Sequence, residues 1–363
     1  MGAHPVGTAI NVEIPWWRAR LVRPPATFPD MNTITATAIP TRPAKQPAAK
    51  LWTAAVWAAT VGAAGWAVAR LAGVEPGGPG VQLMAFTQYA AAGSVVTLGL
   101  ALLSRRWLAA AVAAAAAFAL VATVLPRVIG AAADAGPTTL RVLTANLLFG
   151  GAPPADVLRL VREERVDVLA LQEYTEQARD GLAAAGLAAE LPYLVAYPEP
   201  GASGSALYSR YPLRDTGLLA LPSGFQQARG VLDMPGAVPV DVVSVHPSAP
   251  AAWDRIADWR ADFAAEPRAE PDGPVRLLIG DFNATLDHAP MRALIRSGYV
   301  DAADAAGAGL TPTWPYDERW YIPGVTIDHV LADRRVGIGA VRVHRIPGSD
   351  HRAVFAELHL PAA

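Results

Sequence analysis

The chain of 363 residues contains no cysteine, which excludes a disulfide framework, a thiolate metal site and a cysteine nucleophile. Lysine is almost absent, since Lys45 and Lys50 are its two occurrences. Residues 138–363 therefore depend on arginine for positive charge, and their 20 Arg against 28 Asp and Glu give a net charge of −8. So acidic a region lacks the basic face on which nonspecific nucleic-acid binding depends, and we do not expect nucleic acid to be a partner.

Apolar residues, by contrast, are abundant. They make up 52% of the chain, and the mean hydropathy is +0.25, which points to membrane segments. Three uncharged stretches, Leu51–Ala69, Val81–Ser104 and Trp107–Leu125, each approach the ~20 residues that a helix needs to cross the hydrocarbon core of a bilayer. We predict a three-helix transmembrane anchor over residues 51–126. The alternative, a buried helical hairpin of a soluble protein, is disfavoured by three such stretches in succession.

The charges around these stretches predict their orientation. Three basic residues between positions 42 and 50 precede the first stretch, and Arg105 and Arg106 lie between the second and third. The loop between the first and second stretches holds one arginine and one glutamate. By the positive-inside rule the N-terminal tail then faces the cytoplasm, and three spans place the C-terminal domain outside the cell.

The tail, residues 1–50, shows no sustained periodicity and has no apolar h-region near its start. We therefore predict a flexible cytoplasmic tail rather than a cleaved signal peptide, and the start of the chain is left open between Met1 and Met31. Residues 127–137 form a predicted short tether, and residues 138–363 form the C-terminal domain.

Within the C-terminal domain, strand-like and helix-like segments alternate, which predicts an α+β fold: a two-sheet β-sandwich flanked by helices. We expect strands over Leu140–Phe149, Asp167–Leu171, Tyr193–Tyr197, Ser205–Ser209, Gly230–Met234, Val238–Val245, Leu277–Ile279, Val325–Leu331, Ala340–Val343 and Ala353–Leu360. We expect helices over Pro153–Glu164, Thr175–Ala185, Ala251–Ala264 and His288–Arg296. No internal repeat is evident in the sequence, although a sandwich with pseudo-twofold symmetry could hide one.

Polar side chains recur where these strands end. Asp281 and Asn283 follow an apolar run and Gly280, and the alternation of strand side chains puts both on one face. Alone, this pattern is also typical of a strand followed by a turn. Other segments have the same kind of ending, namely Asn146, Glu173, His246, Asp328, Asp350 and His351. One rim would thus gather hard oxygen ligands, which suit Mg²⁺ or Mn²⁺, beside imidazoles, which suit proton transfer in phosphate esters.

These motifs allow a family resemblance to be named. Asn146, Leu171-Gln172-Glu173, Gly280-Asp281-Phe282-Asn283, Ile327-Asp328-His329 and Gly348-Ser349-Asp350-His351 resemble, in order, the motifs of the endonuclease/exonuclease/phosphatase superfamily, which has the DNase I-like fold. The resemblance covers about residues 139–360. The three-span anchor is similar to the membrane-bound branch associated with glycopeptide (vancomycin/teicoplanin) resistance in actinobacteria. The resemblance implies a divalent-metal-dependent phosphoric ester hydrolase, acting outside the cell on a lipid-linked phosphate or pyrophosphate of the envelope.

The resemblance also implies roles for individual residues. Glu173 would be the principal metal ligand, with Asn146 beside it, and Asp350 would complete the metal site or support His351. Asp281 and Asn283 would position the phosphate and the attacking water, and Asn283 would also bind substrate.

Further roles follow for the histidines. His351, paired with Asp328, would act as a base or as a stabiliser of the transition state, and His246 would protonate the leaving oxygen. Arg229 is a candidate phosphate contact, and Leu148 stands where some nucleases have an Asp that supports a second metal. An anchored extracellular nuclease and a non-catalytic module that binds envelope ligands remain alternatives.

Several histidines and one serine near these motifs are not assigned to the site. His329 should point away from Asp328, because side chains alternate along a strand. Ser349 is interpreted as a turn residue, since no Gly-x-Ser-x-Gly elbow surrounds it. His288, like two later histidines, is expected to be solvent-exposed.

Overall fold

The computed structural model describes residues 47–130, 136–316, 319 and 321–363. The chain divides into two units, residues 1–47 and 48–363, and the account below concerns the second, together with Pro47 at the start of its first helix. The predicted flexible tail lies outside the described residues except at its last few positions, as do the possible start at Met31 and residues 131–135 of the predicted tether.

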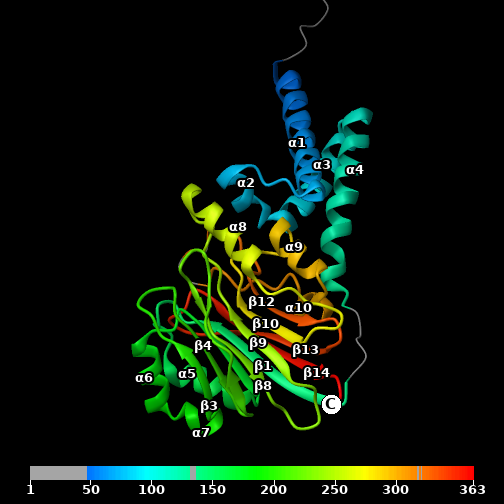
Figure 1. Cartoon of the computed structure of the whole chain (residues 1–363). Coiled ribbons are helices and arrows are strands. Elements are labelled where there is room, and N and C mark those ends of the chain that lie inside the picture. Colours follow the sequence, from blue (N-terminus) through cyan, green and yellow to red (C-terminus); the bar gives the residue numbers. More distant parts are fainter. Residues whose placement is uncertain (1–46, 131–135, 317–318, 320) are drawn as a thin grey trace, which may run out of the picture. The chain divides into compact units, whose positions relative to one another are not determined.

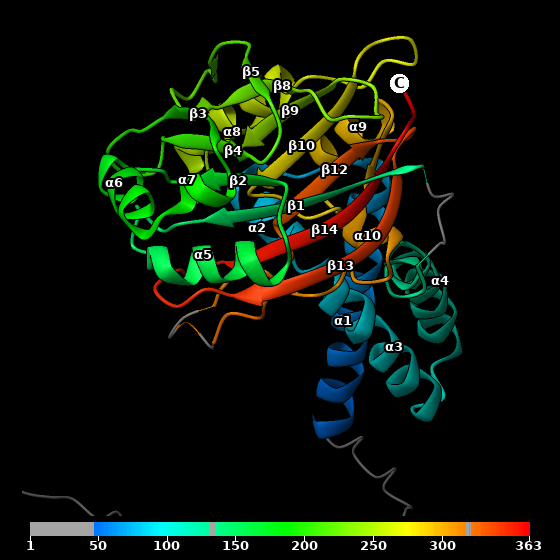
Figure 2. The same cartoon turned by 90° about the horizontal axis from the view of Figure 1, so that it is seen from below.

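The apolar N-terminal stretches are helical. Helix α1 covers Pro47–Ala72, α2 covers Gly77–Met84, α3 covers Thr87–Leu103 and α4 covers Trp107–Val124, followed by a 3-10 turn over Leu125–Val128. Two spans, Ala48–Ala72 and Trp107–Val128, are long and apolar enough to cross a membrane, and α2 with α3 makes a third only as a pair bent by 82°. In Figures 1 and 2, α1, α3 and α4 lie side by side.

The predicted span Val81–Ser104 is therefore corrected: it is not one straight helix but breaks near Ala85. The physical reason lies in α2, whose Val81 is fully buried in the same apolar cluster as Trp259 of the C-terminal domain. Helix α2 thus packs on that domain, while α3 continues beside α1 and α4 (Figure 1).

The C-terminal domain contains two six-stranded sheets. The first has the order β13-β14-β1-β2-β4-β3 and the second the order β11-β12-β10-β9-β8-β5. The strands of the first sheet are β1 (Thr138–Asn146), β2 (Val168–Gln172), β3 (Tyr193–Tyr197), β4 (Ser205–Ser209), β13 (Gly337–Arg345) and β14 (Arg352–Leu360). Those of the second are β5 (Leu213–Asp215), β8 (Arg229–Leu232), β9 (Val240–Val245), β10 (Val275–Asp281), β11 (Tyr299–Asp301) and β12 (Asp328–Asp333). A small sheet pairs β6 (Leu219–Ala220) with β7 (Gln226–Gln227).

The two large sheets share one pairing pattern. Strand β1 runs parallel to β2 and antiparallel to β14, and in the other sheet β10 runs parallel to β9 and antiparallel to β12. The outer pairs of both sheets are all antiparallel. The repeat that the sequence hides is therefore present in the strand pairing, with β1, β2 and β14 equivalent to β10, β9 and β12.

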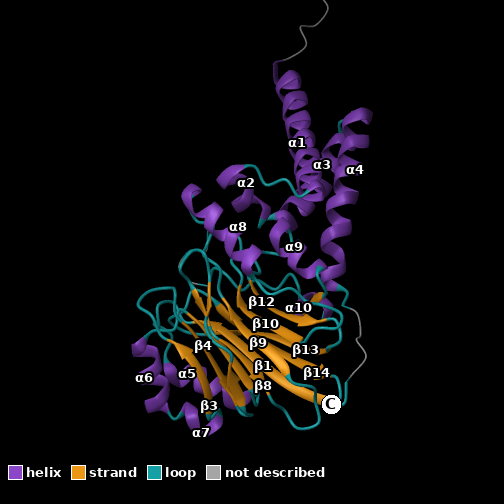
Figure 3. Ribbon diagram, in the orientation of Figure 1, coloured by secondary structure: helices purple, strands orange, loops and turns teal. Residues whose placement is uncertain are grey.

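Apolar residues form layers on both faces of each sheet, because alternate strand residues point to opposite faces. Val142 and Leu277 belong to the core between the sheets. Leu143 belongs to the outer layer under α5 (Pro154–Glu163), α6 (Glu176–Ala185) and α7 (Leu187–Glu190), and Leu278 to the layer under α8 (Ile256–Ala265) and α9 (Ala289–Arg296). Figure 3 shows the strands between these two groups of helices. The predicted fold class, α+β with two sheets and flanking helices, is confirmed.

Two predicted segments are shifted. The helix expected over Ala251–Ala264 begins as a 3-10 turn at Trp253–Arg255 and becomes α-helical at Ile256. The strand expected from Val325 begins at Asp328, because Val325 forms an isolated bridge with Trp314 instead of joining the sheet. The short strands β5 and β11 and the short helix α10 (Ala302–Ala305) were not predicted.

The apolar helices are tied to this domain by a buried ion-pair cluster. Asp287, in the loop between β10 and α9, accepts a hydrogen bond of 2.6 Å from Nε of Arg70 at the end of α1. Arg127, which follows α4, donates to both oxygens of the same carboxylate at 2.7 and 2.8 Å. Two candidate membrane helices are thus fixed to the loop between β10 and α9.

Candidate active site

The predicted site residues converge from equivalent strands of the two sheets. In chain order they are Asn146 at the end of β1, Glu173 after β2, His246 after β9, Asp281 at the end of β10, Asp328 at the start of β12 and His351 before β14. All six are buried. Because the sheets share one pairing pattern, each supplies one side chain from each of three equivalent strand ends.

The backbone at these ends is specialised. A Cβ added at Gly280 would lie 2.0 Å from the carbonyl oxygen of Val245, so only glycine lets β9 and β10 approach so closely just before His246. Glu173 has a positive φ angle of 55°, which costs roughly 1–3 kcal/mol in a residue of this kind, whereas the φ of 49° at Asn283 is one that asparagine tolerates. Strain of this kind collects at functional sites, where the surrounding fold enforces it.

Asn146 joins the carboxylates of the two sheets. Its Nδ2 donates to Oε1 of Glu173 at 3.0 Å and to Oδ2 of Asp281 at 3.1 Å. The backbone N–H of Phe149 donates to Oε2 of Glu173 at 2.7 Å. Burial raises the pKa of Glu173, and the nearby carboxylate of Asp350 raises it further, against these hydrogen bonds. The amide of Asn146 therefore holds two carboxylates in place, while direct metal ligation by Asn146 stays a prediction.

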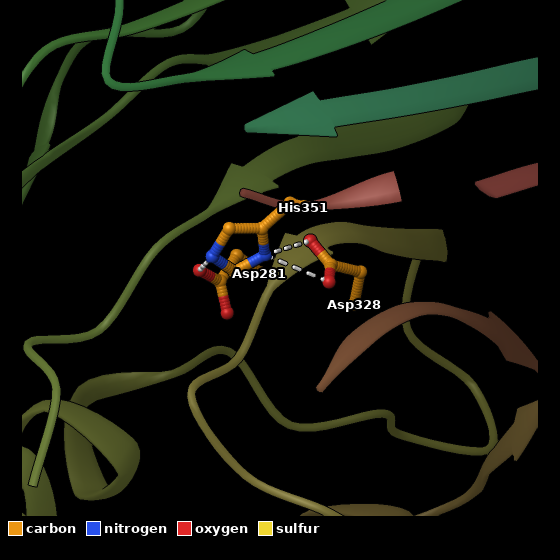
Figure 4. Close-up of side chains that lie close together, drawn as sticks. All are labelled: Asp281, Asp328 and His351. Atoms are coloured by element: carbon orange, nitrogen blue, oxygen red, sulfur yellow. Dashed lines mark hydrogen bonds and ion pairs between the residues drawn. The ribbon is translucent and has the colours of Figure 1, made fainter. Parts of the chain in front are cut away.

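His351 and Asp328 form a buried pair (Figure 4), in which Nδ1 of His351 lies 3.0 and 3.2 Å from the two carboxylate oxygens. Nε2 of His351 lies 3.6 Å from Oδ2 of Asp281. Burial lowers the pKa of His351, but the carboxylates of Asp328 and Asp281 outweigh burial and raise this pKa to about 10. His351 consequently carries its proton at neutral pH.

His246 also faces Asp281. Its Nε2 is also 3.6 Å from Oδ2 of Asp281, so this oxygen faces two imidazoles at the same distance. Burial lowers the pKa of His246; Asp281 opposes this effect, and the neighbouring His351 adds to it. The site therefore holds one protonated and one neutral imidazole.

Asp350 has one free oxygen. Its Oδ2 accepts a hydrogen bond of 3.1 Å from Nε1 of Trp314 and pairs with Arg319. Its Oδ1 is buried, has no hydrogen-bond partner among the described residues and lies 3.9 Å from Nε2 of His351. A buried carboxylate oxygen without a donor calls for a cation or an ordered water.

The donor set fits a hard divalent cation. The ligand atoms of Asp281, Asp328 and His351 lie within 4.8 Å of one another. Two of these three residues are carboxylates, which are the hard ligands that such a cation prefers. Four carboxylates, those of Glu173, Asp281, Asp328 and Asp350, gather here with little exposure to solvent, and their oxygen donors suit Mg²⁺ or Mn²⁺.

One predicted site residue is not brought to this cluster. Both Nε and Nη2 of Arg229 are engaged with Asp241 at 2.9 and 2.7 Å, and Arg276 donates to the same carboxylate at 2.7 Å. Asp241 lies near the beginning of β9, whereas His246 follows the end of that strand. The expected phosphate contact by Arg229 is therefore corrected, because its guanidinium neutralises a buried carboxylate at the opposite end of the sheet.

The residues left out of the site also have clear positions. His329 points to the opposite face from Asp328, where Nδ1 lies 2.8 Å from Oδ2 of Asp301. Ser349 is a turn residue, as expected: its Oγ donates to the carbonyl of Asn146 at 2.8 Å and accepts from the N–H of His351 at 3.0 Å.

Sequence reasoning missed the residues that support the rim. Trp314 and Arg319 hold Asp350, and Oγ1 of Thr313 accepts the N–H groups of Ile327 and Asp328 at 3.0 and 3.2 Å. They lie in a connection without apolar periodicity, so no pattern marks them. The Trp314-Pro315 pair is the local signal that could have drawn attention to this connection.

Comparisons with known proteins agree with this geometry. The sequence model of the Endonuclease/Exonuclease/phosphatase family matches residues 143–351, which is more than half of the chain. No curated protein matches the chain significantly.

Solved structures share the fold. The endonuclease/exonuclease/phosphatase from Beutenbergia cavernae DSM 12333 is 21% identical with a TM-score of 0.53, over 61% of this chain and 72% of that chain. The 3′ phosphatase NExo from Neisseria, bound to a product DNA hairpin, is 20% identical with a TM-score of 0.48, over 60% and 98%. D. rerio TDP2 in complex with a single-strand DNA product is 13% identical with a TM-score of 0.48, over 61% and 99%. The first likeness shows the fold alone, and the other two, with TM-scores below 0.5, carry no argument.

Proposed function

This chain is a member of the endonuclease/exonuclease/phosphatase family, and we propose that it is a membrane-anchored, divalent-metal-dependent phosphoesterase. In this proposal the catalytic domain lies outside the cytoplasm and hydrolyses a lipid-linked phosphate or pyrophosphate of the cell envelope. The metal is Mg²⁺ or Mn²⁺.

The observation that carries the proposal is the position of Asp287. This carboxylate binds the ends of two candidate membrane helices through Arg70 and Arg127, and it lies six positions after Asp281 on the same loop. A site fixed this close to the ends of membrane helices favours a substrate that is itself presented at the membrane surface.

The charge states of the site suggest how its residues act. Asp281 and Asn283 position the phosphate and the attacking water, and Asn283 is set in place by the 2.8 Å bond from its N–H to Oδ1 of Asp281. Of the two roles left open for His351, its raised pKa supports stabilisation of the transition state rather than action as a base, with Asp328 holding the imidazolium.

The two proton transfers need two groups, because the attacking and leaving oxygens lie in line on opposite sides of the phosphorus. In this proposal Asp281, whose pKa burial raises, accepts the proton of the attacking water, and His246 gives a proton to the leaving oxygen. Glu173 and Asp350 would hold the divalent ion, which when bound neutralises charge on the phosphoryl oxygens.

The location outside the cell is part of the same proposal. Three spans, counting the bent α2–α3 pair as one, put the two ends of the chain on opposite sides, and basic residues flank the ends of the helices away from the domain. The similarity of this arrangement to the branch associated with glycopeptide resistance supports an envelope lipid as the substrate.

The test follows, in parallel and with Mg²⁺, Mn²⁺ or chelator, phosphate release by the full chain from a prenyl pyrophosphate lipid and ester cleavage of a phospholipid and of DNA. We expect metal-dependent release that is fastest with the prenyl lipid and is lost in Asp281→Ala. Faster cleavage of DNA would replace the proposal by an anchored nuclease. No release from any ester would favour a non-catalytic binding module. A reporter active only in the cytoplasm, fused to the C-terminus, should be silent; activity there would overturn the topology.

A further inference from the structure

A cavity of about 380 Å³ opens between the bend that joins α2 to α3 and the rim of the active site. Its lining is mostly apolar and includes Ala85 and Phe86 from the bend and Asn283, Trp314, Ile322 and Ile327 from the domain. We call it the tail pocket. Its volume falls at the lower end of the range of about 300–1,000 Å³ that is typical of small-molecule sites.

The tail pocket adjoins the groups that would hold the phosphate. Asn283 lies two residues after Asp281, and Ile327 directly precedes Asp328. Trp314 turns its Nε1 toward Asp350, to which it donates at 3.1 Å. A ligand in the tail pocket would therefore touch residues that are adjacent to the metal site on two sides.

The membrane-helix wall of the tail pocket is firmly attached to the domain. Nε2 of Gln82 donates to the carbonyls of Pro250 and Ala251 at 3.1 and 3.0 Å. The hydroxyl of Tyr89, at the start of α3, donates to the carbonyl of Gly324 at 2.7 Å. This wall belongs to the folded site rather than to a separate anchor.

A histidine completes this attachment. His288, expected to be solvent-exposed, is instead buried, and its Nε2 lies 2.9 Å from the carbonyl oxygen of Val81. That expectation is corrected, because α2 covers the imidazole and uses it as a hydrogen-bond partner.

The same wall leads toward the bilayer. Helix α3 continues from Phe86 as part of a candidate span, and its apolar side chains Val95 and Val96 are 49% and 62% exposed. Leu83 of α2 is 51% exposed beside the bend. Exposed apolar side chains are thus present both on the candidate span and beside the bend that lines the tail pocket.

We propose that the tail pocket binds the first carbons of the single apolar chain of a prenyl phosphate, while its phosphate lies against Asp281, Asn283 and His351. Ala85 and Phe86 then act as specificity-determining residues supplied by the membrane helices. This inference rests on the proposed function. One chain fits a cavity of this volume, whereas the two chains of a glycerolipid would have to diverge at its mouth.

The test compares a filled tail pocket with a matched control. Ala85→Trp fills the cavity, and Val96→Trp adds the same bulk to an exposed position of α3. In the full-length protein in micelles, Ala85→Trp should lower kcat/KM for a long-chain prenyl phosphate by about tenfold or more, and by much less for phenyl phosphate, which has no tail to fill the pocket. Val96→Trp should leave both unchanged. Equal losses on both esters, or no loss on either, would contradict the proposal. If Ala85→Trp lowered kcat/KM more for a diacylglycerol phosphate than for the prenyl phosphate, the tail pocket would instead bind a two-chain lipid.

A measurement without turnover separates this inference from the proposed function. A prenyl phosphate with a diazirine on its first isoprene units is photolysed with the wild-type protein and with Phe86→Ala, and the labelled peptides are identified by mass spectrometry. We expect label on the 85–86 and 314–322 peptides of the wild type and less in the variant. Label confined to the lipid-facing sides of α1, α3 and α4 would overturn the tail pocket. Label in the tail pocket without any phosphate release would support the tail pocket and contradict the proposed phosphoesterase activity.

Discussion

Asp281 and Asp287 lie at the two ends of one short connection, are 1% and 2% exposed, and are held in opposite ways. Burial would raise the pKa of Asp287, but hydrogen bonds and ion pairs with Arg127 and Arg70 outweigh it and lower that pKa. Burial raises the pKa of Asp281, and although His351 opposes this effect, the carboxylate of Asp328 adds to it. The chain supplies two guanidinium groups to one carboxylate and leaves the other short of positive charge.

The difference separates a structural carboxylate from a functional one. At Asp287 both charges come from the protein, so the cluster is complete in the fold and fixes the membrane helices. At Asp281 the neighbouring carboxylate of Asp328 adds to the effect of burial, and the metal ion of the proposed function would oppose both. Removing a partner from a complete buried pair leaves an uncompensated charge, whereas removing a carboxylate from an acidic cluster relieves repulsion. Stability and activity should therefore respond in opposite ways at the two positions.

The largest expected effect is on catalysis at Asp281. Asp281→Asn should lower the rate of metal-dependent phosphate release by on the order of 10³-fold or more, because the site loses both a positioning group and part of its charge. The melting temperature without metal should stay the same or rise, since a buried and poorly compensated carboxylate is removed. Activity and thermal melting of the same preparation test both expectations. A variant that is less stable yet active would place Asp281 among the structural residues.

Asp287 should show the reverse. Asp287→Ala leaves Arg70 and Arg127 buried without a partner, which should cost about 3–5 kcal/mol of folding free energy. Thermal or denaturant unfolding of the full chain measures the loss, with Asp254→Ala, at an exposed position, as the control. Stability equal to that of the control would mean that the membrane helices do not depend on this cluster.

How much of this contrast could be predicted depends on the local pattern. Glu173 and Asp281 were identified because periodic apolar runs end beside them, and alternation fixes which way a strand residue points. Arg229 was misplaced because its partner, Asp241, lies on a neighbouring strand, and a sequence does not reveal which carboxylate a guanidinium will meet. The role of Asp287 was missed for the same reason, since its partners lie more than 150 positions away.

The bend near Ala85 could not be predicted for a different reason. Hydropathy is the same for a helix in a bilayer and for one packed on an apolar protein surface, so residues 81–104 resembled one span. Only the burial of Val81 in the domain distinguishes the two. The fold could thus be predicted from periodicity, while the attachment of the helices and the tail pocket could not, because both depend on contacts between distant segments.

A third prediction concerns metal binding by Glu173. Glu173→Gln keeps the hydrogen-bonding shape beside Asn146 but removes a negative charge, so the metal concentration for half-maximal activity should rise by about 10–100-fold. A Mn²⁺ titration of the rate, with Glu176→Gln at an exposed position as the control, measures this shift. A lower maximal rate at an unchanged metal requirement would assign Glu173 to the substrate rather than to the metal.

The smallest expected effect is on the pH dependence of the unfolding free energy. The folded-state pKa of Asp287 is lowered, so its contribution to stability is fully present above the ordinary aspartate pKa of about 4 and is lost as the pH falls through the folded value. The difference in unfolding free energy between wild type and Asp287→Asn should therefore be constant from about pH 5 to 8 and shrink below about pH 4, by about 1.4 kcal/mol for each unit of pKa shift. Because other carboxylates titrate in both proteins, the difference isolates Asp287. If the difference in unfolding free energy grew on acidification, the effect of burial on the pKa of Asp287 would outweigh that of the two arginines. The pKa of Asp287 would then be raised, like that of Asp281.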